Sequence, residues 1–181
     1  LFIRSAWRRA RADRERCHSR AARLRQSLIR STSPEQTEAF GARLAAGLPP
    51  HVDAPTIVYL TGDLGAGKTT LAKGFVRGCG ITATVRSPTY ALLEPYEARS
   101  FTVLHLDLYR LRDPSELEPL GLRDWAEPGN VWIIEWPEKG GPKLPAPDVR
   151  IALSVTDQAH EIAATSTSPF GRTWLERANT A

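Results

Sequence analysis

The chain of 181 residues is 41% hydrophobic and carries a formal net charge of +4. This length and composition allow one sizeable core and predict one domain. Only two cysteines are present, without a C-x-x-C pair, so neither a disulfide framework nor a zinc site is indicated. The apolar runs are too short to cross a bilayer and no segment has the layout of a secretory signal, so we predict a cytoplasmic protein without membrane contact.

The basic segment at residues 1–30 differs sharply from the rest of the chain. It contains ten arginines and two acidic residues, a net charge of +8, which leaves a net charge of −4 on the remainder. A nucleic-acid-binding arm or an organelle transit peptide would have such a composition. The chain begins with leucine and contains no methionine, which favours an extension that is not part of the native product. We therefore expect a disordered or non-native extension at residues 1–30 and a single folded domain at residues 31–181.

The first predicted helix begins next to a capping signal. Ser33 and Gln36 fit an S-x-x-Q capping box, and Pro34 occupies the first helical position, where proline is tolerated. Apolar residues then recur at every fourth position, which predicts an amphipathic helix to about Gly47. Ordered structure is therefore expected from about Ser33.

A buried strand at residues 57–60 leads into a glycine-rich loop and a helix that ends near Gly78. The loop matches the phosphate-binding pattern G-x-x-x-x-G-K-[ST] in residues Gly62, Asp63, Leu64, Gly65, Ala66, Gly67, Lys68 and Thr69. Glycines allow successive backbone amides to converge on an anion. Lys68 supplies a positive charge for the β- and γ-phosphates, and the Thr69 hydroxyl can ligate Mg²⁺. The segment predicts a nucleoside triphosphate site.

Further strands and short helices are expected after this helix. The strands are predicted at residues 101–107, 131–135, 150–156 and 161–167. Pro88 interrupts the alternating stretch before them, so this stretch is either an edge strand or a loop between two strands. Short helices are predicted at residues 114–120, 123–126 and 174–178. This mixture of strands and helices around the loop predicts an α/β fold.

Two acidic residues, Asp107 and Glu135, end predicted apolar strands. The carboxyl ends of parallel strands lie at the edge of the sheet where ligands bind, and Mg²⁺ on phosphates needs oxygen ligands. One carboxylate could ligate the metal while the other orients or deprotonates the attacking water, and sequence order does not assign these roles. Either residue alone could be an ordinary turn or strand-end residue. The pair predicts that at least one of them belongs to the site.

Three other residues have a functional and a structural interpretation. Thr89 could reach the γ-phosphate or the metal from a mobile loop, or it could serve ordinary turn chemistry. His105 lies in the middle of a predicted strand and is expected to be a hydrogen-bonded structural histidine. Trp136 is expected to be a partly buried anchor that could also shape the nucleotide pocket. The chain has no N-K-x-D or T-K-x-D segment, and no D-x-x-G follows a strand, so ATP is favoured over GTP.

Four segments of this chain resemble the TsaE (YjeE) family of bacterial ATPases in order and spacing. They are GDLGAGKTTLAKGFVRGCGI, VRSPTYALLEPY, LHLDLYRLRDPSELEPLGLRDW and VWIIEWPEKG. The resemblance implies a P-loop α/β domain with a mixed central sheet flanked by helices. It also implies ATP and Mg²⁺ as cofactors, the proteins TsaD and TsaB as partners, and an indirect role with tRNA. The expected task is ATP hydrolysis that supports threonylcarbamoylation of adenosine 37 in tRNAs reading codons that start with A.

The same resemblance assigns roles to individual residues. It implies that the loop from Leu64 to Thr69 binds the phosphates and that Thr69 and Glu135 ligate Mg²⁺. It matches Asp107 to an essential Walker B-like aspartate, and Thr70 and Trp136 to other functional positions. The expected catalytic residues are thus Lys68, Asp107 and Glu135.

Two rival functions remain open at this point. A small-molecule kinase of the P-loop class would need an acceptor pocket and usually several arginines over the transferred phosphoryl group, and only Arg110 and Arg112 lie near the expected site. A module that binds partner proteins when ATP is bound would need no catalysis. Phosphate release from ATP in the absence of an acceptor would argue against the kinase. In the second rival hydrolysis would be incidental, and it is tested by Lys68→Ala, which should lose ATP binding, and Asp107→Ala, which should keep binding but lose turnover.

Overall fold

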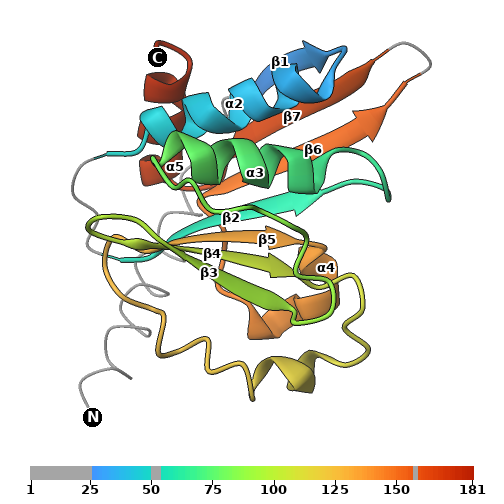
Figure 1. Cartoon of the computed structure of the whole chain (residues 1–181), viewed down its shortest axis with the longest axis vertical. Helices are drawn as coiled ribbons and strands as arrows, with labels where there is room; N and C mark the ends of the chain where they lie inside the picture. Colours follow the sequence, from blue (N-terminus) through green and yellow to red (C-terminus); the bar gives the residue numbers. More distant parts are fainter. Residues whose placement is uncertain (1–25, 50–53, 157–158) are drawn as a thin grey trace.

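A seven-stranded mixed sheet forms the centre of the protein (Figure 1). The structure is a computed structural model in which residues 26–49, 54–156 and 159–181 are described. The strands are β1 (Gln26–Ser31), β2 (Thr56–Thr61), β3 (Leu93–Glu97), β4 (Thr102–Asp107), β5 (Val131–Glu135), β6 (Val149–Val155) and β7 (His160–Ser166). Their order across the sheet is β1-β7-β6-β2-β5-β4-β3. The four central strands β6, β2, β5 and β4 are parallel, whereas β1, β7 and β3 pair antiparallel with their neighbours.

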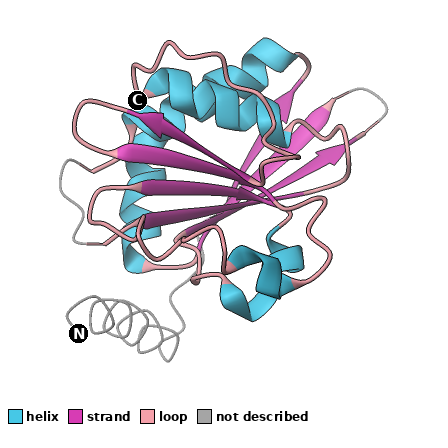
Figure 2. Cartoon of the chain, turned by 60° about the horizontal axis from the view of Figure 1, so that its bottom comes forward, coloured by secondary structure: helices cyan, strands magenta, loops and turns pink. Residues whose placement is uncertain are grey.

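Helices cover both faces of this sheet (Figure 2). The α-helices are α2 (Pro34–Ala46), α3 (Lys68–Gly78), α4 (Pro137–Gly140) and α5 (Pro169–Ala178). Two 3₁₀ turns, η2 (Pro114–Leu117) and η3 (Gly141–Lys143), lie close to α4. Figure 1 shows α2, α3 and α5 on one face and α4 on the other. The predicted α/β fold with a mixed sheet flanked by helices is confirmed.

The core has two parts, one on each face of the sheet. Along β2 and β5, successive buried side chains alternate between the two parts, as the period of a strand requires. On the face of the longer helices, Phe40 of α2 and Phe75 of α3 are both 1% exposed, and Trp174 of α5 is fully buried. On the other face, the fully buried Trp132 packs with Leu117 and Leu144 from the short helical segments. Because β2 and β5 are covered on both faces, their ends have fixed positions.

Close packing of α2 against α3 fixes the helix that follows the glycine-rich loop. A Cβ atom on Gly74 would lie 2.0 Å from the Glu38 carbonyl oxygen, so only glycine allows the two backbones to approach so closely. The Glu38 carboxylate also pairs with Lys73 at 2.7 Å and with Arg77 at 2.6 Å. These contacts hold α3 on the sheet with its N-terminus at the loop.

The start of α2 follows the sequence prediction, with one difference in the capping contacts. The Ser33 hydroxyl accepts a hydrogen bond from the Gln36 amide at 3.4 Å, and Pro34 is the first helical residue. The Gln36 side chain, however, accepts from the Thr32 amide at 2.8 Å. The reciprocal bond of the predicted capping box is therefore made one residue earlier, because β1 ends immediately before the helix and presents the Thr32 amide.

Several other elements differ from the sequence predictions. The sequence assigns residues 26–30 to the basic extension, but the structure places them in β1, where they pair with β7. The rest of the predicted extension, residues 1–25, lies outside the described residues. Residues 123–126 form turns and not a helix, and α4 and η3 are additional. Pro88 lies in a loop, and β3 follows it as an edge strand.

In the described part of the chain, no helix combines the length and apolar character that a membrane span requires.

Candidate functional site

The glycine-rich loop connects the end of β2 to the start of α3. Gly62, Gly65 and Gly67 have φ values of 133°, 81° and 99°, a region that side-chain-bearing residues rarely adopt. A Cβ atom on Gly62 would lie 2.0 Å from the Leu153 carbonyl oxygen of β6, so this position also requires glycine for space. The sequence thus forms a loop in which the backbone itself can face a ligand, directly before the positive end of a helix dipole.

Lys68 lies across this loop with its ammonium group held by uncharged partners. Its Nζ donates to the carbonyl oxygens of Gly62 at 2.6 Å and Asp63 at 2.7 Å. It also lies 4.0 Å from the centroid of the Trp136 ring. Burial lowers the pKa of Lys68, while nearby carboxylates, led by Glu135, act in the opposite direction. A phosphate group would be a stronger partner than these carbonyls, because hydrogen bonds between two charged groups are stronger than those to neutral acceptors.

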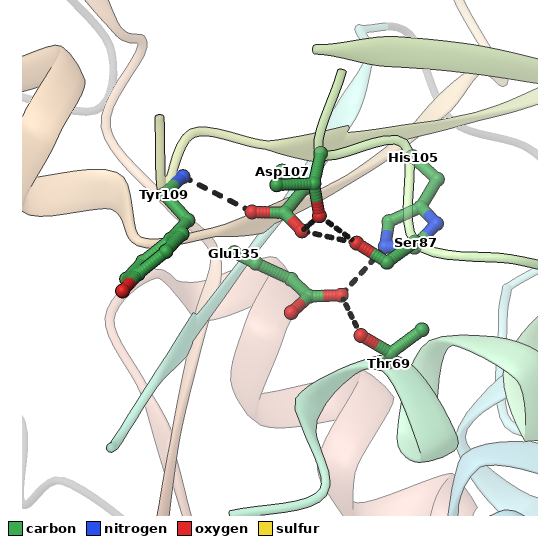
Figure 3. A network of polar contacts seen from close by, with 7 residues as sticks. Thr69, Ser87, His105, Asp107, Tyr109 and Glu135 are labelled. Carbon is green, nitrogen blue, oxygen red and sulfur yellow. Dashed lines mark hydrogen bonds and ion pairs between the residues drawn. The ribbon is translucent and has the colours of Figure 1, made fainter. Parts of the chain in front are cut away.

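Glu135 connects the glycine-rich loop to the interior of the sheet (Figure 3). The Thr69 hydroxyl donates to Oε1 of Glu135 at 2.9 Å, and Nε2 of His105 lies 2.8 Å from the same oxygen. His105 is fully buried, and its Nδ1 has no hydrogen-bond partner among the described residues. A proton on Nδ1 would therefore be an unsatisfied donor, so the proton belongs on Nε2, facing the carboxylate. His105 is the hydrogen-bonded histidine that the sequence predicts.

Asp107 has a different set of partners, two from the loop that follows α3 and one from the backbone just after β4 (Figure 3). Its Oδ2 accepts from the hydroxyls of Ser87 and Thr89, the latter at 2.6 Å, and its Oδ1 accepts from the Tyr109 amide at 3.0 Å. Thr89 therefore contacts the carboxylate and not merely its own turn. Glu135, and not Asp107, hydrogen bonds to Thr69 in the described structure. The structure therefore distinguishes the two acids by their hydrogen-bond partners, which sequence order alone could not do.

These groups surround a cavity of about 460 Å³. It is lined by Leu64, Gly65, Gly67, Lys68, Thr69, Thr70, Ser87, Thr89, Asp107, Tyr109, Arg110, Glu135 and Trp136. Three of the predicted loop residues are outside this lining. Gly62 and Asp63 contribute carbonyl oxygens to Lys68, and Ala66 is buried in the core. The remaining predicted site residues are all brought together around one space.

Sequence reasoning missed several residues that contact the site. Tyr109 packs against Trp136 with ring centroids 5.1 Å apart. Arg110, which the sequence already placed near the site, lines the cavity, and its guanidinium lies 4.1 Å from the ring centroid of Tyr90, which was not predicted. Ser87 stands two residues before Thr89 in the same Ser-Pro-Thr segment, a signal that could have found it. His160 Nδ1 lies 2.9 Å from the carbonyl oxygen of Ala66 in the loop, but His160 is distant in sequence and its neighbouring residues give no sign of this contact.

The oxygen groups present fit a hard divalent cation such as Mg²⁺. The Thr69 hydroxyl and the Glu135 carboxylate are side by side, and oxygen ligands are those that Mg²⁺ prefers. Across the described ranges, no group of three or more His, Cys, Asp or Glu side chains could hold a metal ion. A cation here would therefore share its coordination with water and with phosphate oxygens, as is usual for Mg²⁺ in nucleotide sites.

Comparison with known proteins gives a consistent result. The family model described as threonylcarbamoyl adenosine biosynthesis protein TsaE matches residues 31–163. The tRNA threonylcarbamoyladenosine biosynthesis protein TsaE of Haemophilus influenzae is 43% identical over 122 residues, covering 67% of this chain and 77% of that protein. Its namesake in Bacillus subtilis is 35% identical over 144 residues, covering 79% and 87%. The crystal structure of Bacillus subtilis YdiB aligns with a TM-score of 0.70 at 28% identity, covering 88% of this chain and 98% of that one.

Proposed function

The chain belongs to the TsaE family of tRNA threonylcarbamoyladenosine biosynthesis, and from this premise we propose that it is an ATPase that binds and hydrolyses Mg-ATP. The hydrolysis supports a complex of TsaD and TsaB, which threonylcarbamoylates adenosine 37 of tRNAs reading codons that start with A. The protein acts on tRNA indirectly, through these partners, and works in the cytoplasm. The acidic balance outside residues 1–30 suits binding to partner proteins better than direct binding to RNA.

The observation that carries this proposal is the meeting of three features at one cavity. The glycine-rich loop opens α3, the Lys68 ammonium is hydrogen bonded to two carbonyl oxygens and lies against an aromatic face, and the Thr69 hydroxyl touches the Glu135 carboxylate. The first two features suit the phosphates of a nucleotide. The third suits the cation that accompanies them. Thr69 and Glu135 are thus the residues that would hold Mg²⁺, which when bound neutralises charge on the phosphate oxygens.

The chain's own residues divide the work of hydrolysis. Lys68 binds and orients the β- and γ-phosphates by exchanging its carbonyl partners for phosphate oxygens. Asp107 holds the hydroxyls of Ser87 and Thr89 at the wall of the cavity, where Thr89 can orient a water molecule. The Asp107 carboxylate accepts two hydrogen bonds at Oδ2 and one at Oδ1, so Oδ1 keeps a lone pair that can take a proton from that water. Trp136 and Tyr109 place two packed aromatic rings at the wall of the cavity.

Two measurements test this function. The purified protein with Mg-ATP alone should release phosphate, and adding TsaD and TsaB should raise the rate. Release that occurs only when a metabolite acceptor is added would instead identify a small-molecule kinase. Binding of ATP without any release, with or without the partners, would identify a nucleotide-dependent binding module.

The biological role is tested separately in cells. Depletion of the protein should lower threonylcarbamoyladenosine in bulk tRNA, as measured by mass spectrometry. Restoring the wild-type chain should bring the modification back, and restoring Lys68→Ala should not. An unchanged level of modification after depletion would reject the role in tRNA modification and leave the nucleotide site to be judged by the first experiment.

A further inference from the structure

The hairpin of β6 and β7 lies against the back of the glycine-rich loop at two points. At β6, the Leu153 carbonyl occupies the space that a side chain on Gly62 would need. At β7, Nδ1 of His160 lies 2.9 Å from the carbonyl oxygen of Ala66. Since a carbonyl oxygen can only accept, His160 donates this hydrogen bond through Nδ1. A histidine 94 residues along the chain is thus attached to the middle of the loop.

This contact determines the direction of a backbone amide. The Ala66 carbonyl and the Gly67 N–H belong to the same planar trans peptide and point in opposite directions. With the carbonyl held toward His160, the Gly67 N–H must point away from β7. Gly67 is also one of the residues that line the cavity, and it is the N-cap of α3. The hydrogen bond therefore turns a donor toward the space proposed for the phosphates.

The loop needs such a restraint because its composition does not supply one. Gly67 has a φ of 99° and no Cβ atom, so the peptide before it can rotate with little steric cost. His160 is itself held in place by the sheet. His160 begins β7 and is paired with Ser31 of β1 on one side and with Val155 of β6 on the other. The His160 ring also packs beside Gly67: a Cβ atom on Gly67 would lie 3.6 Å from His160 Nδ1, an ordinary packing distance.

We propose that His160 is a positioning residue for the phosphate-binding loop, which holds the Ala66–Gly67 peptide in the orientation that presents the Gly67 amide to an anion. This inference rests on the proposed nucleotide binding but concerns a residue that lies outside the loop and the cavity lining. It implies that the β6–β7 hairpin, besides packing on the core, fixes the conformation of the glycine-rich loop. It sets the geometry of the anion site in advance of binding.

The test compares His160→Ala with His160→Asn, whose amide nitrogen can occupy the place of Nδ1. ADP affinity is measured by isothermal titration calorimetry in EDTA, so that the metal ligands make no contribution. We expect His160→Ala to weaken ADP binding by roughly three- to tenfold, the effect of one hydrogen bond. His160→Asn should stay within about twofold of wild type. Glu161→Ala, an exposed change at the next position of β7, is the matched control and should bind ADP as wild type does.

A second readout does not depend on nucleotide. In the amide NMR spectrum of the free protein, His160→Ala should shift or broaden the Gly67 signal, and His160→Asn should restore it. Unchanged ADP affinity and an unchanged Gly67 signal in His160→Ala would overturn the inference, even if the variant melted at a lower temperature. If wild type bound neither ADP nor Mg-ATP, the proposed function would fail, and the Gly67 signal would still decide whether His160 orients the loop.

Discussion

Asp107 and Glu135 lie directly opposite each other on the neighbouring parallel strands β4 and β5, yet their carboxylates bind different parts of the site. Glu135 accepts from Thr69 and His105, whereas Asp107 accepts from Ser87, Thr89 and the Tyr109 backbone. One acid is thus hydrogen bonded to the phosphate-binding loop and the other to the loop of Ser87 and Thr89, which lines the cavity. Substitutions of the two should therefore have different consequences, although the residues are adjacent in the sheet.

Lys68→Ala should abolish most nucleotide binding. It removes the charged donor that the phosphates would take over from two carbonyl groups. Hydrogen bonds to charged groups contribute about 1.5–3 kcal/mol, so affinity for ATP should fall by at least about tenfold. Titration calorimetry measures the effect. Lys143→Ala is a suitable control, because Lys143 is half exposed and pairs with Glu118 outside the cavity lining; equal losses in both variants would contradict the role of Lys68.

Asp107→Ala should bind ATP but hydrolyse it slowly. The change removes the acceptor that holds Ser87 and Thr89 while leaving Lys68, Thr69 and Glu135 in place. Loss of an acid or base typically costs about a hundredfold or more in rate, so we expect kcat to fall by that order with a nearly unchanged dissociation constant. Phosphate release and calorimetry measure the two quantities.

The control for Asp107 is Asp113→Ala, which removes an exposed aspartate that caps η2. Its kcat should match that of the wild type. Normal hydrolysis by Asp107→Ala would show that neither its carboxylate nor the hydroxyls it holds are needed for turnover.

His105→Leu should destabilise the fold through Glu135. The leucine would leave a carboxylate that is 2% exposed with one donor in place of two. A buried group that loses its partner costs about 1–3 kcal/mol, and the free energy of unfolding in urea should decrease by that amount. His105→Gln, which can donate from a similar position, should recover much of the loss. Equal destabilisation by both variants would assign the effect to packing alone.

Cys79 should react very slowly with thiol reagents. Burial raises the pKa of Cys79 to about 12, so only a minute fraction is thiolate near neutral pH. In a Cys17→Ser background, the folded protein at pH 8 should react about 1,000-fold more slowly than the urea-unfolded chain. The rate should rise about tenfold for each unit between pH 8 and pH 10, because thiolate is the reactive form. A rate that is independent of pH would show that access, and not ionisation, controls the reaction.

Features encoded by neighbouring residues were predictable from the sequence. The strand at residues 57–60 and the loop to Thr69 have a local signature, and β5 is a continuous apolar run between polar ends. The ends of two such strands also predict that Asp107 and Glu135 approach the loop, because parallel strands share one carboxyl edge. These predictions depend on chain geometry that short segments carry by themselves.

Features that depend on distant partners were not predictable. β1 lies in a stretch dominated by arginine, and it becomes a strand by pairing with β7, which is more than a hundred residues away. The contact of His160 with Ala66 has the same origin. Residues 123–126 have the composition of a helix, but Asn130 and Trp132 side chains donate to the Trp125 carbonyl and favour a turn there. In β1 and at residues 123–126, tertiary contacts outweigh the secondary structure that the local sequence favours.

Trp136 lies with its ring beside the Lys68 ammonium, and its backbone is in the left-handed region at φ 57°. Among the tryptophans that the structure describes, this is the one whose ring neighbours the Lys68 ammonium, the charge that would attract a phosphate. When that ammonium moves from the ring to an anion, the electrostatic field at the indole changes, and so does its fluorescence. The intrinsic fluorescence of Trp136 should therefore report the binding of an anion in the cavity without an added dye.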